Sequence, residues 1–194
     1  IGLIGYGYWG KILLPRLKKF GKVEFICTSK DTYEDKLKNV DWVVVATPSQ
    51  THYQIVKNCL NNGVNVFCEK SLTLDYAQSL ELYEIAKQNN AKLYVNDVFM
   101  FRKQIDEIKK SIEFTKTDFY ILYNIIGDEV YDIESIEIKD HLSFSLKIKD
   151  KKINFLYDRL QNQNHHSINK IDLMHNGDDS DALNLMFDYV FINR

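Results

Sequence analysis

The chain has 194 residues, of which 45% are hydrophobic and 27% charged, and its formal net charge is −2. This is the composition of an ordinary globular protein, and the length allows one sizeable domain or one domain with a smaller companion. The balanced charge, without a basic stripe, argues against nucleic acid as a partner. Apolar runs are too short to span a bilayer and no secretory signal is visible, so we expect a cytoplasmic protein with no membrane partner.

The first half of the chain alternates short apolar strands with helical segments. Strands are expected at 1–4, 23–27, 40–46, 64–68 and 93–95, and helices at 8–20, 31–39, 51–61 and 73–90. In the last of these helices the expected apolar side comprises Leu74, Ala77, Leu80, Leu82, Tyr83 and Ala86. Such alternation predicts a doubly wound parallel sheet, which binds ligands outside the carboxyl ends of its strands. Residues 1–102 are therefore predicted to form an α/β Rossmann domain.

The second half has a different pattern. Helices are expected at 104–111 and 179–190, and strands at 118–123, 133–138, 142–148 and 153–157. The strand at 142–148 alternates apolar and polar side chains, as a sheet with one wet face does, and residues 149–152 suit a hairpin turn. We predict that residues 103–194 form an α+β domain with a mostly antiparallel sheet.

Three cysteines, Cys27, Cys59 and Cys68, have neither metal-site spacing nor the even number of a disulfide set. Cys27 and Cys68 lie in apolar strand-like runs. We expect buried thiols that act as small hydrophobic side chains in a reducing compartment, and we expect no metal site.

The first motif is the run Gly5-Tyr6-Gly7-Tyr8-Trp9-Gly10, which follows a strand and opens a helix. In such a loop the first glycine allows the tight turn, the second lets the backbone approach a pyrophosphate, and the third lets helix and strand pack closely. The amides at the helix start then face the phosphates. In this context the run predicts dinucleotide binding. Without a ligand it would be a glycine turn and nothing more.

The end of the second strand bears on the choice of cofactor. NAD enzymes usually place a carboxylate there for the ribose 2′-hydroxyl, but this chain has Thr28, Ser29 and Lys30, and the first carboxylate is Asp31. Hydroxyls and an ammonium group suit a 2′-phosphate, because they donate hydrogen bonds and compensate its charge. The sequence therefore favours NADP over NAD, unless Lys30 is only a solvated surface lysine.

Two further groups follow the third and fourth strands. Thr47 and Pro48 shape the first strand end, Ser49 or Thr51 could cap the next helix, and His52 would shape the cofactor site more readily than act as a catalyst. Glu69 and Lys70 follow the fourth strand, where the nicotinamide would lie. Lysine there can polarise a hydroxyl or carbonyl oxygen during hydride transfer, and a neighbouring carboxylate keeps it charged. The alternative is an ordinary ion pair at a strand end.

Together these motifs resemble the glucose-fructose oxidoreductase / inositol dehydrogenase family, known as Gfo/Idh/MocA, over residues 1–102. The glycine loop resembles that of members acting on sugars or nucleotide sugars. The family's Thr-Pro…His stretch matches Thr47-Pro48 and His52, and its Glu-Lys-Pro motif matches Glu69-Lys70, with Ser71 in place of proline. The resemblance gives Lys70 contacts to the nicotinamide ribose and the substrate, and places Asn96 and Asp97 along the cleft. It implies NAD or NADP as cofactor and a sugar-like substrate. It also implies that the sheet of residues 103–194 shapes the sugar pocket and provides a homo-oligomer contact.

Departures from the family pattern leave alternatives open. Ser71 would loosen the placement of Lys70, and the short second helix would leave the adenine side open. The family's second domain carries an acid/base pair on a helix, and no histidine of the second half has a matching context (His141, His165, His166 and His175). The chain is either a naturally shortened member or the ordered parts of a longer chain run together, with joins near 124–128 and 174–178.

Two functions follow from these patterns. The first is an NAD(P)-dependent oxidoreductase of sugar metabolism, and the second is a non-catalytic module that binds NAD(P) or a sugar. A short-chain dehydrogenase or epimerase is disfavoured, because Tyr83 and Lys87 have the right spacing but lie on a helix assigned to packing.

Overall fold

The computed structural model describes residues 1–101, 132–138, 141–148, 151–158, 167–168, 171–172 and 179–193. The chain divides into two compact units, one formed by Ile1–Asp97 with Met186–Arg194 and the other by Val98–Leu185. Each unit has its own sheet structure and is described separately below.

The first unit contains a five-stranded sheet with the order β2-β1-β3-β4-β5, in which every neighbouring pair is parallel. Its strands are β1 (Gly2–Ile4), β2 (Phe25–Cys27), β3 (Trp42–Val45), β4 (Asn65–Cys68) and β5 (Leu93–Val95). The predicted Rossmann-like sheet is confirmed. Its strand order reverses between β1 and β3, and such a switch point is where doubly wound sheets bind their ligands.

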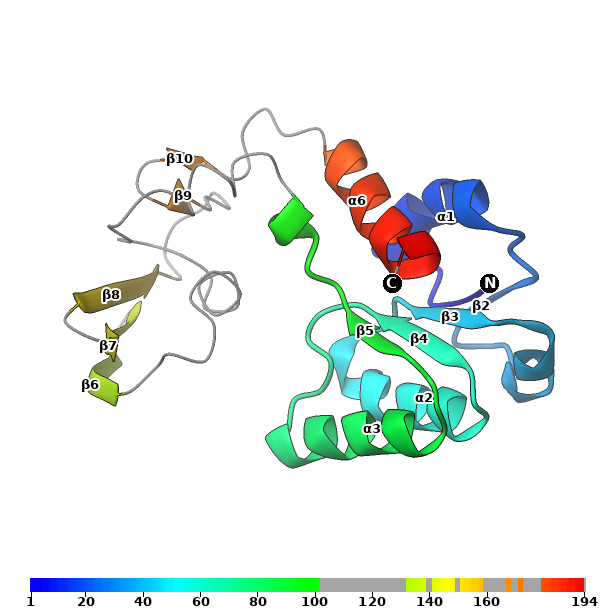
Figure 1. The fold of residues 1–194 in the computed structure, drawn as a ribbon, viewed down its shortest axis with the longest axis horizontal. Coiled ribbons are helices and arrows are strands. Elements are labelled where there is room, and N and C mark those ends of the chain that lie inside the picture. Colours follow the sequence, from blue (N-terminus) through cyan, green and yellow to red (C-terminus); the bar gives the residue numbers. More distant parts are fainter. Residues whose placement is uncertain are drawn as a thin grey trace. The chain divides into compact units, whose positions relative to one another are not determined.

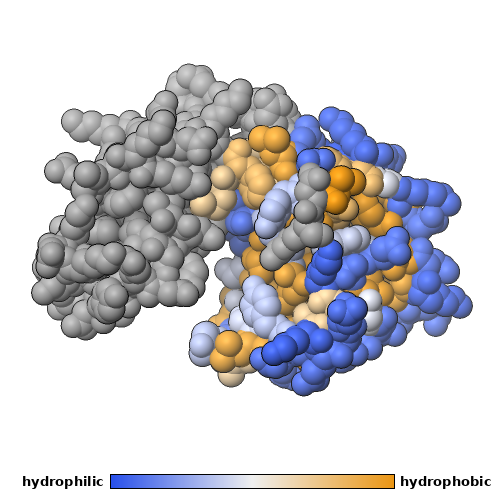
Figure 2. All heavy atoms as spheres, viewed as in Figure 1, coloured by the Kyte–Doolittle hydropathy of each residue, from blue (hydrophilic) through white to orange (hydrophobic). Residues whose placement is uncertain are grey.

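Helices cover both faces of this sheet (Figure 1). Helix α1 (Tyr8–Phe20) lies on one face, and Pro15 is accommodated inside it without ending the helix. Helices α2 (Ser49–Asn61) and α3 (Tyr76–Gln88) lie on the other. A 3-10 helix, η1 (Glu34–Asn39), stands where the sequence predicted the short segment 31–39. Hydrophilic side chains cover the outer margin of this unit, as expected of helix surfaces that face water (Figure 2).

The sheet buries side chains on both faces. In the strand register Leu3, Val44, Phe67 and Tyr94 fall on neighbouring positions, and all four are buried. The alternate positions of the strands contribute to the core shared with α2 and α3. A parallel sheet covered on both sides needs such continuous apolar strands, and for this reason the apolar runs in the sequence predicted the strands.

The C-terminal segment completes one face of this unit. Helix α6 (Asp179–Asp188) continues as a π-helical turn, Tyr189–Asn193. The Phe187 ring meets Phe67 edge-on, with centroids 5.3 Å apart, and Phe20 at 5.9 Å. The Phe191 ring meets Trp42 at 5.0 Å. The division of the chain at 102/103 stays a prediction, and these contacts place the end of the chain on the first unit.

Helix α3 corrects one detail of the sequence analysis. Its buried residues are Leu82, Ile85 and Ala86, whereas several residues of the predicted apolar side are exposed: Leu74, Ala77, Leu80 and Tyr83. Apolar residues surround much of this helix, so periodicity alone did not identify the side that packs against the sheet.

The second unit contains a three-stranded antiparallel sheet of β6 (Asp132–Ile138), β7 (His141–Ile148) and β8 (Lys151–Asp158). Strands β9 (Ser167–Ile168) and β10 (Ile171–Asp172) form a separate pair, and a 3-10 turn, η2 (Val98–Phe101), opens the unit. The segments predicted at 104–111 and 118–123, the suggested joins, and residues 149–150 of the turn predicted at 149–152 lie outside the described residues, whereas residues 151–152 begin β8. The α+β assignment of this half, and an oligomer contact through its sheet, stay predictions.

All three cysteines are buried as free thiols, as predicted. Burial raises the pKa of Cys59 to about 12, and it also raises the pKa of Cys68. Within the described part of the chain, no helix has the length and apolar character of a membrane span. The same residues contain no group of three or more His, Cys, Asp or Glu side chains arranged for a metal ion.

Candidate functional site

The predicted site residues of the first unit follow the carboxyl ends of its strands. The residue just after a strand donates its backbone N–H to the end of a neighbouring strand at four points: Gly5 to Cys27, Ala46 to Ile4, Glu69 to Val45 and Asn96 to Cys68, over 2.8–2.9 Å. These bonds hold the loops after β1, β3, β4 and β5 side by side at one edge of the sheet. The glycine loop and the Lys70 turn therefore share an edge.

The three positions of the first loop are glycine for different structural reasons. Gly5 has φ 99°, and a Cβ there would lie 2.5 Å from the carbonyl group of Ala46. A Cβ on Gly10 would lie 2.0 Å from the Gly5 carbonyl oxygen. A Cβ on Gly7, in contrast, would meet no atom within 4 Å. Packing explains the first and third glycines, and the open space at Gly7 is what a bound ligand would need for close approach.

Helix α1 starts at this open point. Gly7 is its N-cap, no side chain caps the helix, and its first turn contains no acidic residue. The positive end of the helix dipole is therefore not neutralised by a side chain of its own first turn. Tyr8 and Trp9 follow with side chains that are 77% and 45% exposed, packed edge-to-face with ring centroids 5.8 Å apart. The arrangement suits an anion next to an aromatic surface.

The end of β2 forms a tight polar turn. Asp31 Oδ2 accepts hydrogen bonds from the Thr28 backbone N–H at 2.8 Å and from the Thr28 hydroxyl at 2.7 Å. These bonds hold the pKa of Asp31 below its ordinary value. Ser29 and Lys30 lie exposed in the same turn. Asp31 is the first carboxylate after β2, and the turn brings it back to the strand end.

The loop after β3 leads into α2 without a side-chain cap. Pro48 occupies the N-cap position, so the predicted capping by Ser49 or Thr51 is wrong. The Thr51 hydroxyl lies 2.8 Å from both Thr47 Oγ and the Pro48 carbonyl oxygen. Thr51, in the first turn of the helix, therefore stabilises the loop, because its hydroxyl contacts Thr47 and Pro48, which precede the helix.

His52 is fully buried and lies between two loops. Its Nδ1 is 2.7 Å from the carbonyl oxygen of Ser71, and its Nε2 is 2.8 Å from the carbonyl oxygen of Thr47. Both ring nitrogens thus face backbone groups, so the imidazole is placed to hold the loops rather than to exchange protons with a ligand.

Glu69 and Lys70 diverge at the end of β4. The Glu69 side chain is 6% exposed and accepts a hydrogen bond from Asn96 Nδ2 at 2.8 Å. Burial raises the pKa of Glu69, and the Asn96 hydrogen bond and the Lys70 charge oppose this effect. Lys70 is exposed at the edge of the sheet, and its peptide bond to Ser71 is cis. The pair is therefore not a simple surface ion pair, because only one of its members faces water.

The residues after β5 are divided in the same way. Asn96 is buried and holds Glu69, so its amide is committed within the protein. Asp97 is half-buried and accepts a hydrogen bond from the Tyr94 hydroxyl. Two members of the site were not predicted from the sequence, the carboxylate of Asp31 and the backbone carbonyl of Ser71. The Thr28…Asp31 spacing, typical of a side-chain-closed turn, could have indicated Asp31, whereas the Ser71 carbonyl is a backbone group that no sequence signal marks.

Comparisons with known proteins agree with this geometry. Residues 11–97 match the model of the oxidoreductase family Gfo/Idh/MocA, described as an NAD-binding Rossmann fold. An uncharacterized oxidoreductase of Streptococcus pneumoniae is 28% identical over 67% of this chain and 38% of its own length. A myo-inositol 2-dehydrogenase of Thermotoga maritima is 27% identical over 58% of this chain and 40% of its own.

The chain thus spans about two-fifths of the length of these two curated relatives. Among solved structures, a dehydrogenase from Clostridium difficile superposes with a TM-score of 0.69 at 24% identity, covering 81% of this chain and 69% of that one. At this identity the likeness concerns the fold.

Proposed function

We propose that the protein transfers a hydride between NAD or NADP and a sugar-like substrate, because residues 11–97 match the NAD-binding Rossmann fold of the Gfo/Idh/MocA oxidoreductases. The reacting group would be a hydroxyl carbon or the corresponding carbonyl. A myo-inositol dehydrogenase among the relatives supports a polyol or sugar as the substrate class.

The observation that carries the proposal is the contrast at the glycine loop. Gly5 and Gly10 are required by contacts within the chain, but Gly7 has open space on its Cβ side. A pyrophosphate next to Gly7 would also meet the uncapped start of α1. The residues present therefore fit a dinucleotide, whose nicotinamide supplies or accepts the hydride when bound.

The remaining site residues follow from the same placement. Gly5, Gly7, Tyr8, Trp9 and Gly10 would hold the pyrophosphate and its surroundings. The loop after β3, with Thr47, Pro48 and His52, and the end of β4, with Glu69, would support the nicotinamide half. Asn96 and Asp97 would lie nearest the substrate. The amide of Asn96 would act there indirectly, by holding Glu69 through their hydrogen bond.

Lys70 is the proposed catalytic residue. Its ammonium group, on an exposed side chain next to a buried carboxylate, would donate a hydrogen bond to the reacting oxygen and stabilise the charge that develops there.

The β2 turn sets the choice between the two cofactors. Thr28, Ser29 and Lys30 favour a 2′-phosphate, as the sequence analysis argued, whereas the Asp31 carboxylate at the same turn favours a free 2′-hydroxyl. We propose NADP as the preferred cofactor. Isothermal titration of the wild type with NADP⁺ and NAD⁺ decides this. Lys30→Ala should then weaken binding of NADP⁺ and Asp31→Asn should weaken binding of NAD⁺.

Cofactor binding tests the proposal directly. Titration calorimetry of the whole chain with NAD⁺, NADH, NADP⁺ and NADPH should show binding of at least one of them. Gly7→Val should weaken that binding on the order of 100-fold. Gly7→Ala should weaken it less and raise stability by about 0.4–1 kcal/mol, because the backbone there is compatible with alanine.

Gly21→Ala, at the other end of α1, is the matched control and should leave affinity unchanged. A folded wild-type protein that binds none of the four nucleotides contradicts the proposal.

Turnover separates the enzyme from the non-catalytic alternative. The wild-type protein should reduce its preferred oxidised cofactor with at least one member of a panel of inositols, aldoses and sugar acids. Lys70→Met should lower kcat about 100-fold or more while the affinity for the cofactor stays within a few-fold. Binding without turnover on any member of the panel, in both wild type and variant, would favour the binding module.

A further inference from the structure

We propose that His52 is a positioning residue that ties the Lys70 turn to the loop after β3. The inference rests on the proposed role of Lys70, and it concerns how this chain holds that lysine in place. The evidence is the bridge formed by one buried ring: His52 Nδ1 lies 2.7 Å from the Ser71 carbonyl oxygen and Nε2 lies 2.8 Å from the Thr47 carbonyl oxygen.

The Ser71 end of the bridge acts on Lys70 through the backbone. Ser71 directly follows Lys70, so a bond to its carbonyl oxygen restrains the orientation of the residue next to the lysine. The Lys70 side chain itself is exposed. The bond at Ser71 would therefore hold the position of the ammonium group through the backbone.

The Thr47 end connects this turn to the glycine loop. A Cβ on Gly5 would lie 2.7 Å from the Thr47 backbone nitrogen, so the first glycine turn packs directly on Thr47. The chain of contacts runs from Gly5 through Thr47 and His52 to Ser71. It joins the loop proposed to hold the pyrophosphate to the turn that carries the proposed catalytic residue.

The chemistry of the ring supports a clamp. Carbonyl oxygens only accept hydrogen bonds, and a neutral imidazole donates from one nitrogen alone. Only a ring with hydrogen on both nitrogens donates to Thr47 and Ser71 at once.

The test compares His52→Gln with Cys59→Ala. Both substitutions alter a fully buried side chain of α2, but Cys59 belongs to the core shared by the sheet with α2 and α3. The first readout is the rate at which acetic anhydride modifies Lys70 in the whole chain, measured by mass spectrometry relative to Lys30 in the same sample. We expect His52→Gln to change this ratio several-fold and Cys59→Ala to leave it unchanged. An unchanged ratio in folded His52→Gln overturns the proposal.

The second readout is kinetic. On the substrate that the wild type turns over, His52→Gln should lower kcat about 10- to 100-fold, with the Kd for NADH within about three-fold of wild type. Cys59→Ala should lower Tm while kcat is kept. Equal effects of the two variants on kcat, at matched Tm, would mean a purely structural histidine and overturn the proposal.

A third measurement uses the wild type alone, in case His52→Gln does not fold. Nitrogen NMR of ¹⁵N-histidine-labelled protein should find one histidine with hydrogen on both ring nitrogens and slow exchange with water. If the buried ring carries a single hydrogen, it holds one loop only and the clamp is overturned. The NMR and acylation readouts need no cofactor, so they remain decisive if the wild type binds no nucleotide and the proposed function itself fails.

Discussion

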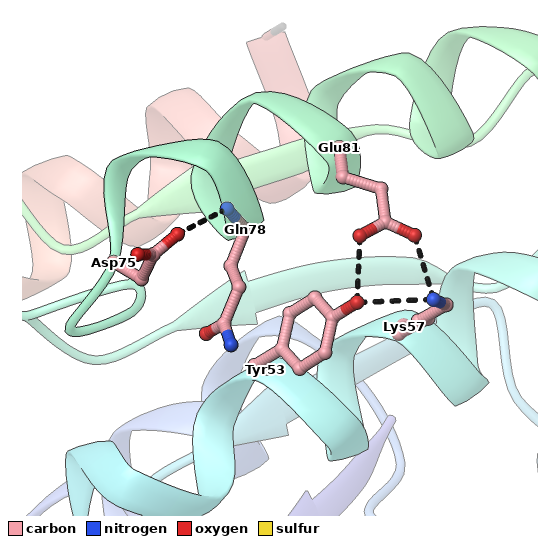
Figure 3. Close-up of polar contacts among 5 residues, drawn as sticks. All are labelled: Tyr53, Lys57, Asp75, Gln78 and Glu81. Carbon is pink, nitrogen blue, oxygen red and sulfur yellow. Dashed lines mark hydrogen bonds and ion pairs between the residues drawn. The ribbon is translucent and has the colours of Figure 1, made fainter.

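Two glutamates of the first unit occupy opposite environments. Glu69, at the end of β4, is buried and accepts a hydrogen bond from Asn96, and burial raises its pKa. Glu81, on α3, is exposed and accepts hydrogen bonds from Lys57 and Tyr53 of α2, each at 2.6 Å (Figure 3). These two bonds lower its pKa. A glutamate side chain is thus a stabilising partner at position 81 and a desolvated group at position 69.

The difference supports the proposed division between a region that serves the fold and a region that serves a ligand. The Tyr53–Lys57–Glu81 group joins two helices at the surface, where ions keep most of their hydration. Burying Glu69 at the carboxyl edge costs free energy that packing alone would not require. A costly polar group at a ligand-binding edge is more often retained for function than for stability.

The largest expected effect comes from removing the partner of the buried carboxylate. Asn96→Leu should lower the free energy of unfolding by about 2 kcal/mol at neutral pH, because Glu69 loses its hydrogen bond. Urea denaturation of the whole chain measures it. In a Glu69→Gln background the loss should shrink, and an identical loss in both backgrounds would show that the two side chains are not coupled.

Much of the parallel sheet could be predicted from the sequence. Covered parallel strands read as continuous apolar runs, so 93–95 was placed at its observed bounds and the ends of the other four strands within two residues. Helix α1 was placed at its observed bounds, 8–20, in spite of Pro15. The short segment 31–39 became a 3-10 helix because six residues between two strands leave too little length for a stable α-helix.

What the sequence did not reveal depends on contacts between distant residues. The Phe187 and Phe191 rings pack on Phe67 and Trp42 from the far end of the chain, and nothing local marks that destination. Motif spacing placed Gly7, His52 and Lys70 at strand ends. It could not show that both nitrogens of His52 meet carbonyl oxygens, since one of these belongs to a residue 19 positions away.

The next prediction concerns whether ionised Glu69 raises or lowers the free energy of unfolding. Glu69→Gln should raise the free energy of unfolding on the order of 1 kcal/mol at neutral pH. The folded protein holds this proton more tightly than the unfolded chain, so stability falls as pH rises from the ordinary value of 4.5 through the higher folded-state pKa. The gain should therefore vanish below about pH 4. A gain that is equal at both pH values would contradict burial as its cause.

A smaller effect is expected at the start of α3. Asp75 is the N-cap of this helix and accepts a hydrogen bond from the Gln78 backbone N–H at 2.9 Å (Figure 3). Asp75→Ala should cost about 1 kcal/mol, measured by thermal melting, because a helix amide loses its acceptor. Asp75→Asn keeps an acceptor and should cost less. Equal losses would assign the effect to charge near the helix start instead of to the cap.

The smallest effect tests the other half of the comparison, at Glu81. Glu81→Gln should lower Tm slightly at neutral pH, less than Asp75→Ala, because the ion pair with Lys57 lies near the surface and salt screens it. The pKa of Glu81 is lowered in the folded state, so its contribution is present above the ordinary value of 4.5 and is lost as pH falls through the folded-state pKa. Melting curves at neutral and acid pH, with Glu84→Gln on the same helix as control, measure this. Relative to wild type, Glu69→Gln should become more stable as pH rises, whereas Glu81→Gln should become less stable. If the stability of both variants changed in the same direction, the distinction between the candidate site and the surface ion pair would be lost.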